Sequence, residues 1–231
     1  MKVYYDLHIH SVLSPCADDD MTPNNIVNMA WLKGLDIIAV TDHNQSGNLE
    51  AIQELAKEKD ILLIPGMEVE SREGVHLLCY FKSFENAFIM AQEMYSSLPD
   101  LPCTEFFGKQ QLMDEEDKVI GNLDKLLISS TKFSIDEIYT IVKKLDGIMG
   151  YAHIYRKSNG ILNVLGFLPE SPKVSFIEIN SKTEDDSTYK RKMRIISNSD
   201  AHRLVDMNEA INCMNIDDKT IKSVFKWLGG F

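Results

Sequence analysis

The sequence predicts a single α/β domain in which strands and helices alternate and the strands close into a barrel. Three observations carry this prediction: a length of 231 residues, a repeated order of strand-like and helix-like segments, and histidines at the strand ends. Repeated strand–helix order implies a parallel sheet with helices outside. Roughly seven strands of this length favour a barrel over an open sheet. One such domain, residues 1–231, fits the chain better than two small ones.

The first part of the chain contains clear helix and strand signals. Thr22 followed by Pro23 has the form of an N-cap with proline at the first helical position, and Gly34 ends that helix. The apolar run 35–41 is typical of a strand buried on both faces. The other strands expected here are 3–10, 61–65 and 75–81, and the other helices are 49–59 and 84–97.

An irregular stretch divides the chain. Residues 99–130 contain two prolines and the acidic run 114–117, and we expect an insertion or lid there. Ser134 and Glu137 form the S-x-x-E pattern of a capping box, which predicts a helix over 135–145. The remaining expected strands are 148–153, 176–180 and 194–199, and a helix is expected at 220–228.

The composition favours a packed core and disfavours some classes of function. Hydrophobic residues make up 44% of the chain, so broad disorder is not expected. The net charge of −11 disfavours extended nucleic-acid binding, although metal ions could reverse the field locally for a small phosphorylated substrate such as a nucleotide. No cysteines form a C-x-x-C pair, and no apolar run suits a signal peptide or a membrane span. We therefore expect a cytoplasmic protein without a membrane partner.

All six histidines lie within or just beyond an expected strand. In parallel α/β folds, functional groups gather at the carboxyl ends of strands, so we expect the histidines to meet. His8 and His10 share one face of a strand and could chelate one metal ion. Asp200 and His202 repeat this geometry with a carboxylate and an imidazole. Asp6 would share the face of His8, where it either orients a ligand or is an ordinary buried polar residue.

Two more strands end in ionisable residues. Asp42 and His43 follow an apolar run, which places them at the rim; His43 is expected to be a ligand, whereas Asp42 orients a ligand or caps a helix. Glu68 and Glu70 share a face after the third strand. A carboxylate has two oxygens, so Glu68 could bridge two metal ions, which an imidazole cannot do. Glu70 is expected in solvent or behind a ligand.

The roles expected of the remaining candidates depend on the other candidate residues of the chain. His76 and His153 would each more often be core histidines, but together with the others we expect them to be metal ligands. Asp18 precedes a helix, where it either complements the helix dipole or supplies a metal ligand. Arg156 and Arg203 follow His153 and His202 closely, so they could contact a phosphate, unless they are ordinary surface arginines.

Taken together, these residues resemble the motifs of the PHP (polymerase and histidinol phosphatase) superfamily of metal-dependent phosphoesterases. The matching segments span residues 6 to 202 and are Asp-Leu-His-Ile-His, Thr-Asp-His-Asn, Gly-Met-Glu, the isolated His76 and His153, and Asn-Ser-Asp-Ala-His. The resemblance implies a distorted (β/α)7 TIM-like barrel with a trinuclear metal centre.

The resemblance also implies how the ligands are shared. The first metal ion would take His8, His10, Glu68 and Asp200; the second would take Glu68, His76 and His153; the third would take His43, His202 and a residue of the first loop. That last position is ambiguous, because the loop is longer than the family's usual Ser-Asp-Gly form. Counting back from Thr22 favours Asp18, and Cys16 is the alternative. The implied catalytic residues are Glu68, Asp200, Arg156 and Arg203.

The expected function is hydrolysis of a phosphate monoester or a nucleotide-type phosphate ester by water that two or three divalent metal ions activate. Histidine-rich sites suit Zn, Mn and Fe alike. Two alternatives stay open: a nuclease of the same fold that trims oligonucleotide ends, and a non-catalytic module that binds metal or phosphate.

Overall fold

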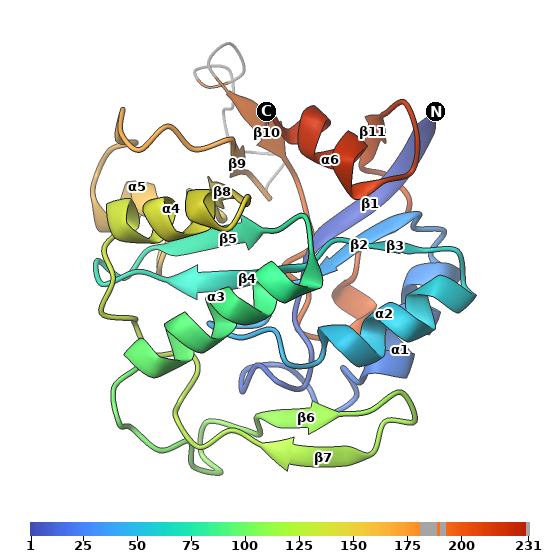
Figure 1. Ribbon diagram of the computed structural model, residues 1–231, viewed down its shortest axis with the longest axis horizontal. Helices are drawn as coiled ribbons and strands as arrows, with labels where there is room; N and C mark the ends of the chain where they lie inside the picture. Colours follow the sequence, from blue (N-terminus) through green and yellow to red (C-terminus); the bar gives the residue numbers. More distant parts are fainter. Residues whose placement is uncertain (181–188, 190–192, 230–231) are drawn as a thin grey trace.

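The strands form two sheets and a separate hairpin (Figure 1). The structure, a computed structural model, describes residues 1–180, 189 and 193–229. The first sheet has the order β11 (Cys213–Asn215), β1 (Lys2–Ile9), β2 (Ile37–Val40) and β3 (Leu62–Leu63). The second has the order β10 (Arg194–Ile196), β9 (Phe176–Glu178), β8 (Ile148–Tyr151), β5 (His76–Tyr80) and β4 (Gly66–Glu70).

Two isolated β-bridges connect the sheets beside the histidines. Ile9 at the end of β1 pairs with Ala201 beyond β10, and His43 beyond β2 pairs with Glu68 in β4. Both edges of the second sheet therefore lie against strand ends of the first. The described residues form a mixed α/β fold, but their ladders do not run continuously around a closed barrel.

The strands are not all parallel, which corrects the sequence prediction. β5 runs antiparallel to β4 and to β8, and β11 runs antiparallel to β1. The connection between β4 and β5 is only residues 71–75, whereas a parallel pair needs a crossover of about a dozen residues or more. A hairpin is therefore the connection that this length of chain allows.

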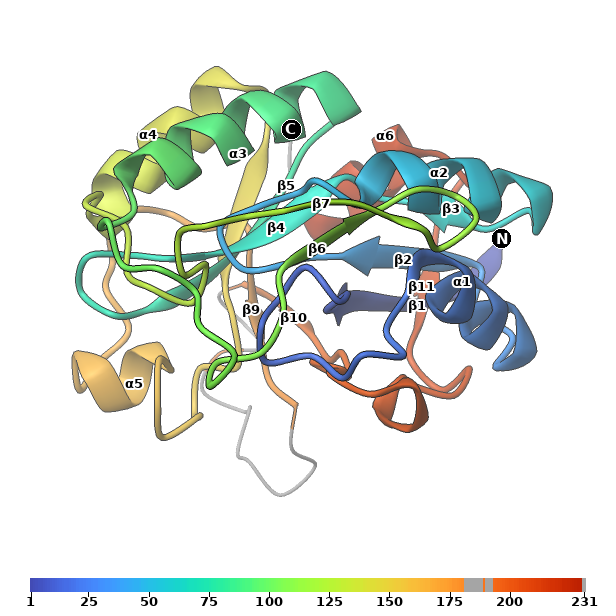
Figure 2. The ribbon, with the colours of Figure 1, turned by 90° about the horizontal axis from the view of Figure 1, so that it is seen from below.

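The helices lie outside the sheets, where α3 (Phe84–Ser97) contacts β4 and α4 (Ile135–Lys144) contacts β8 (Figures 1 and 2). Their starts follow the predicted capping. Thr22 accepts a hydrogen bond from Asn25 N–H at the start of α1 (Pro23–Leu32), and the capping box of Ser134 and Glu137 is complete. α2 (Leu49–Glu58) and α6 (Ile221–Leu228) also confirm predicted helices, whereas α5 (Ile161–Val164) and the short 3-10 helix η1 (Leu204–Asp206) were not predicted.

An apolar cluster fills the space between the sheets. It includes Leu7, Leu78 and Phe176, and α6 covers it with Phe225. Gly150 on β8 leaves room for the Phe176 ring, because a Cβ at this position would lie 2.2 Å from that ring. His8 directly follows Leu7 and His153 directly follows Ala152, which both belong to this cluster, so the packed strands fix where these two histidines lie.

Residues 99–130 contain two strands that the sequence did not predict, β6 (Gln111–Met113) and β7 (Val119–Asn122). This hairpin packs on the first loop of the chain: Gln111 N–H donates to the Val12 carbonyl oxygen, and Met113 N–H donates to Asn48 Oδ1. A lid function for this segment stays a prediction. Each described helix is too short or too polar to cross a lipid bilayer.

Candidate metal centre

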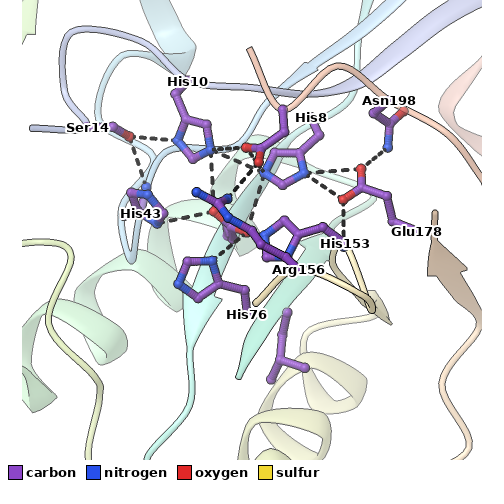
Figure 3. Close-up of polar contacts among 12 residues, drawn as sticks. His8, His10, Ser14, His43, His76, His153, Arg156, Glu178 and Asn198 are labelled. Carbon is purple, nitrogen blue, oxygen red and sulfur yellow. Dashed lines mark hydrogen bonds and ion pairs between the residues drawn. The ribbon is translucent and has the colours of Figure 1, made fainter. Parts of the chain in front are cut away.

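The histidines meet around the carboxylate of Glu68, as Figure 3 shows for those it labels. Glu68 Oε1 lies 3.4 Å from His8 Nε2, 2.9 Å from His76 Nδ1 and 3.0 Å from His153 Nε2. The other oxygen, Oε2, lies 3.4 Å from His10 Nε2 and 3.2 Å from His43 Nδ1. Both oxygens of one buried carboxylate thus face rings from four separate parts of the chain.

Asp200 and His202 complete this group from beyond β10. Asp200 Oδ1 lies 3.3 Å from His8 Nε2 and 3.4 Å from His10 Nε2. The His202 ring stacks on the His10 ring, with 4.2 Å between their centroids. Asp200 has a φ of 54°, and His153 has a φ of 24°. Backbone strain of this kind persists where the surrounding structure enforces it, often at functional sites.

Three groups of ligand atoms are close enough to hold metal ions, with all atoms of a group within 4.8 Å of one another. The groups are His8, His10, Glu68 and Asp200; His43, Glu68 and His76; and His10, His43 and His202. The first group has the composition that the family resemblance implies. In the second, His43 stands where His153 was expected, and in the third, His10 stands where a first-loop residue was expected.

The residues fit divalent metal ions. Several buried polar atoms at this centre have no aligned hydrogen bond within the described part of the chain, and they are His43 Nδ1, Glu68 Oε2, His76 Nδ1, His153 Nδ1 and Asp200 Oδ1. Buried polar atoms normally find hydrogen-bond partners. Imidazole nitrogens and carboxylate oxygens that crowd together without such bonds form the donor set that Zn and similar metals use.

Two hydrogen-bond chains orient the rings of His8 and His10. His8 Nδ1 lies 3.0 Å from Glu178 Oε2, so an Nδ1–H that donates to this carboxylate leaves Nε2 directed at the centre. His10 Nδ1 lies 3.0 Å from Ser14 Oγ, and Ser14 Oγ–H donates to Asp42 Oδ1 at 2.6 Å. Partners of this kind fix the tautomer and orientation of metal-ligating histidines. Of the two roles considered for Asp42, the structure favours orientation of a ligand.

Glu70 plays the same part for His76. Its Oε2 lies 3.2 Å from His76 Nε2, which leaves His76 Nδ1 facing Glu68, and its Oε1 accepts a hydrogen bond from Ser130 Oγ. Glu70 therefore lies behind a ligand rather than in open solvent. Because Ser130 ends the 99–130 segment, that segment takes part in positioning this histidine.

Glu178 was not identified in the sequence analysis, and Asn198 entered it only as the first residue of the Asn-Ser-Asp-Ala-His motif. Glu178 is fully buried on β9, where it accepts hydrogen bonds from His153 N–H and from Asn198 Nδ2 as well as facing His8. Asn198 Oδ1 in turn accepts from Leu7 N–H. The available signal was a lone carboxylate within an apolar strand, because a buried charge needs partners.

Asp6 makes its hydrogen bonds away from the histidine rings, so of its two expected roles it fits that of an ordinary buried polar residue. The register between β1 and β2 shifts between Asp6 and Ile9, so an extra residue interrupts the alternation of the strand. Asp6 accepts hydrogen bonds from the N–H groups of Ser199 and Asn208 instead. It thereby holds the loop that carries Asp200.

Several residues that were predicted to belong to the site lie outside the three ligand groups. Asp18 is exposed and belongs to none of the three groups, although its N–H donates to the His202 carbonyl oxygen. Cys16 is also outside these groups. Arg156 Nη1 donates to Asp200 Oδ2 at 2.7 Å, whereas Arg203 pairs with Asp206 on the surface.

The electrostatics divide the histidines into two kinds. Burial and the nearby His10 hold the pKa of His43 well below its ordinary value, and the same causes lower the pKa of His202 to about 4. These two rings are neutral at pH 7 and can bind metal directly. Burial alone would lower the pKa of His76 and raise that of Glu68, but their mutual attraction raises the pKa of His76 to about 9 and lowers that of Glu68.

Comparison with known proteins gives one family and several structural relatives. The family model of the PHP domain matches residues 6–165. The 5′-3′ exoribonuclease of Haemophilus influenzae is 32% identical to this chain over 81 residues, which are 34% of this chain and 28% of that protein. This chain thus spans less than a third of that relative.

The solved structures that resemble the chain share its fold. Endonuclease Q of Pyrococcus furiosus is similar with a TM-score of 0.74 and 20% identity, over 100% of this chain and 56% of that one. A Bifidobacterium adolescentis protein, described as a proposed metal-dependent phosphoesterase, is similar with a TM-score of 0.59 and 17% identity, over 97% of this chain and 95% of that one.

Proposed function

Because the chain belongs to the PHP domain family, we propose that it hydrolyses phosphate esters at the centre formed by its six histidines. The observation that carries this proposal is the position of Glu68, whose two oxygens face ring nitrogens of five histidines at 2.9–3.4 Å. A carboxylate in this position can be shared between metal ions. The proposed substrates are phosphate monoesters or nucleotide-type esters.

Two or three divalent ions, Zn, Mn or Fe, would be held by the histidines together with Glu68 and Asp200. When bound, such ions supply Lewis-acid activation of water and stabilise negative charge on phosphate oxygens. Asp18 is proposed as an additional ligand only if its loop moves, since its side chain is exposed. Glu178, Asp42 and Glu70 keep the histidine nitrogens directed inward by the hydrogen bonds described above.

Arg156 is the proposed phosphate-binding residue. Its Nη1 donates to Asp200 Oδ2, yet the side chain is 41% exposed, so other N–H groups of the guanidinium remain accessible. A guanidinium can bind phosphate oxygens through two parallel hydrogen bonds. Arg203 is 58% exposed and already pairs with Asp206, so its role in binding phosphate would require it to leave that partner.

Two finer features are also proposed. We propose that the sheets form the distorted barrel of the family, because β-bridges link them at both edges next to the centre. We propose a cytoplasmic location, because Cys16, Cys79, Cys103 and Cys213 are free thiols, as is usual in a reducing compartment.

The direct test is hydrolysis by protein that has been stripped of metal and then given Mn²⁺, Zn²⁺ or Fe²⁺ in turn. We expect phosphate release from a panel of monoesters and nucleotides with at least one metal, and its loss in His10→Ala and Glu68→Gln. Lys57→Ala, an exposed change on α2, should keep full activity. Activity that survives complete chelation would contradict the proposal.

A nuclease acting on strand ends is the second candidate. It is favoured by the similarity to an exoribonuclease and to endonuclease Q, which are proteins that cleave nucleic acids. End-labelled short oligonucleotides would distinguish it, since a nuclease releases mononucleotides whereas a phosphatase removes only the terminal phosphate. A non-catalytic module would bind metal and hydrolyse neither kind of substrate.

A further inference from the structure

Two adjacent phenylalanines of the 99–130 segment present their rings to solvent. Phe106 is 91% exposed and Phe107 is 39% exposed. The two rings meet edge to face, with 5.3 Å between their centroids. Single exposed apolar residues are common on protein surfaces, whereas these two adjacent rings form a larger exposed aromatic surface than one residue does.

The loop that carries these rings lies against the first loop of the chain. The backbones touch at Gly108, where a Cβ would lie 2.0 Å from the Pro15 carbonyl oxygen. Lys109 Nζ lies 2.6 Å from Asp19 Oδ2. Figure 2 shows the green loop before β6 beside the dark blue loop that follows β1. Phe107 therefore directly precedes the residue that contacts Pro15.

The same first loop also contacts the histidines of the metal centre. Ser14, the neighbour of Pro15, lies with Oγ 3.0 Å from His10 Nδ1. Asp18 N–H donates to the His202 carbonyl oxygen at 2.9 Å. The first loop thus contacts both the phenylalanine loop and the histidines, so a ligand of a few nucleotides could contact both.

We propose that Phe106 and Phe107 form a stacking platform for a base of single-stranded nucleic acid whose phosphate lies at the metal centre. This inference rests on the proposed phosphoesterase function and specifies its substrate class. Aromatic side chains stack on any base, because every base has a π-face. A small phosphate ester without a ring would gain nothing from this pair.

The charges of the molecule limit the length of the bound strand. Arg156, Arg203 and Lys109 are cations at or near the centre and the phenylalanine loop, and each pairs with an aspartate. The exposed aspartates 18–20 lie in the first loop beside the phenylalanine loop, and the chain as a whole carries a net charge of −11, so a long run of phosphates is repelled. The platform therefore serves one or a few nucleotides near the cleaved bond rather than a long duplex.

The test compares the binding of thymidine tetranucleotide with that of a tetramer of abasic units, which has the same phosphates but no bases. Calorimetry is done with Ca²⁺ in place of the catalytic metal to prevent cleavage. Stacking of one base supports affinity differences of roughly 5- to 150-fold. We expect the wild type to prefer the tetranucleotide by about this factor, and Phe106→Ala and Phe107→Ala to lose most of the preference.

The controls separate this inference from the proposed function. Trp31→Ala removes an exposed aromatic residue on α1 and should keep the wild-type preference. Wild type and Phe106→Ala should hydrolyse glycerol phosphate, which has no ring, at equal rates. If no variant hydrolysed glycerol phosphate, that result would count against the proposed function alone. Equal binding of the two tetramers by wild type would overturn the platform. So would dimers that disperse on Phe106→Ala, because the rings would then bind a second copy.

Discussion

Glu178 shows how one buried charge can organise a site. Burial would raise its pKa, but the facing His8 and His153 hold the pKa below its ordinary value, so the group is ionised. Its oxygens face His8 Nδ1, His153 N–H and Asn198 Nδ2, which can all donate hydrogen bonds. This position therefore requires a side chain in which both terminal atoms accept hydrogen bonds.

Glu178→Gln should therefore weaken metal binding while leaving the chain folded. The new amide N–H₂ would face hydrogen-bond donors and release the His8 ring from its orientation. Loss of such a partner typically lowers metal affinity about 10–100-fold. Titration calorimetry with Mn²⁺ measures this, with the exposed Glu54→Gln as a control. Affinity within twofold of wild type would show that Glu178 does not position His8.

Metal affinity should rise with pH. Although burial lowers it, contact with Glu68 and Glu70 raises the pKa of His76 to about 9 in the metal-free protein. Below that pH the ring carries a proton, which a metal ion has to displace. Each displaced proton changes the apparent affinity by up to about tenfold per pH unit, and the gain ends above pH 9. Mn²⁺ titrations at pH 6, 7 and 8 check this; a flat profile would contradict it.

Among single residues, the sequence pointed to the histidines and Glu68 and offered Asp42 and Glu70 as supporting residues, but it did not point to Glu178. A histidine or carboxylate at a strand end is visible in the sequence, and the convergence of strand ends follows from the fold class. The shift of register after Asp6 is not visible, so the alternation rule assigned that residue to the wrong face. Glu178 was missed because its partners come from three distant segments.

Among the elements, helix α4 has the most complete capping. Ser134 Oγ accepts from Glu137 N–H, and the Glu137 carboxylate accepts from Ser134 N–H, which lowers the pKa of Glu137. Ser134→Ala should lower the free energy of unfolding by about 0.5–2 kcal/mol. Chemical denaturation measures this, and Ser96→Ala, an exposed serine in α3, should change little. An unchanged midpoint for Ser134→Ala would show that the cap adds no stability.

Helices α1 to α4 and α6 were predictable to within a few residues, but the strand directions were not. Caps such as Thr22 and Ser134 are local signals, so sequence alone marks where α1 and α4 begin. Strand direction depends on which connections cross over. The short link 71–75, which contains Gly74 at φ 79°, carried a hairpin signal that the repeated strand–helix order obscured.

For the whole molecule, the centre joins segments from residue 8 to residue 202 and from both sheets. Metal ions would therefore stabilise the native chain. At a free metal concentration 100 times the Kd, the gain is about 2.7 kcal/mol, or roughly 5–10 °C in Tm for a chain of this length. Chelation should lower Tm by that amount in wild type but not in His10→Ala. Equal shifts in both proteins would indicate metal binding elsewhere.

The most direct measurement is anomalous X-ray diffraction from crystals grown with Mn²⁺. We expect two or three peaks among the side chains of Glu68, Asp200 and the six histidines, with Glu68 adjacent to more than one peak. No peak at this position, with the metal bound elsewhere on the acidic surface or not at all, would contradict the assignment of these residues as a metal centre.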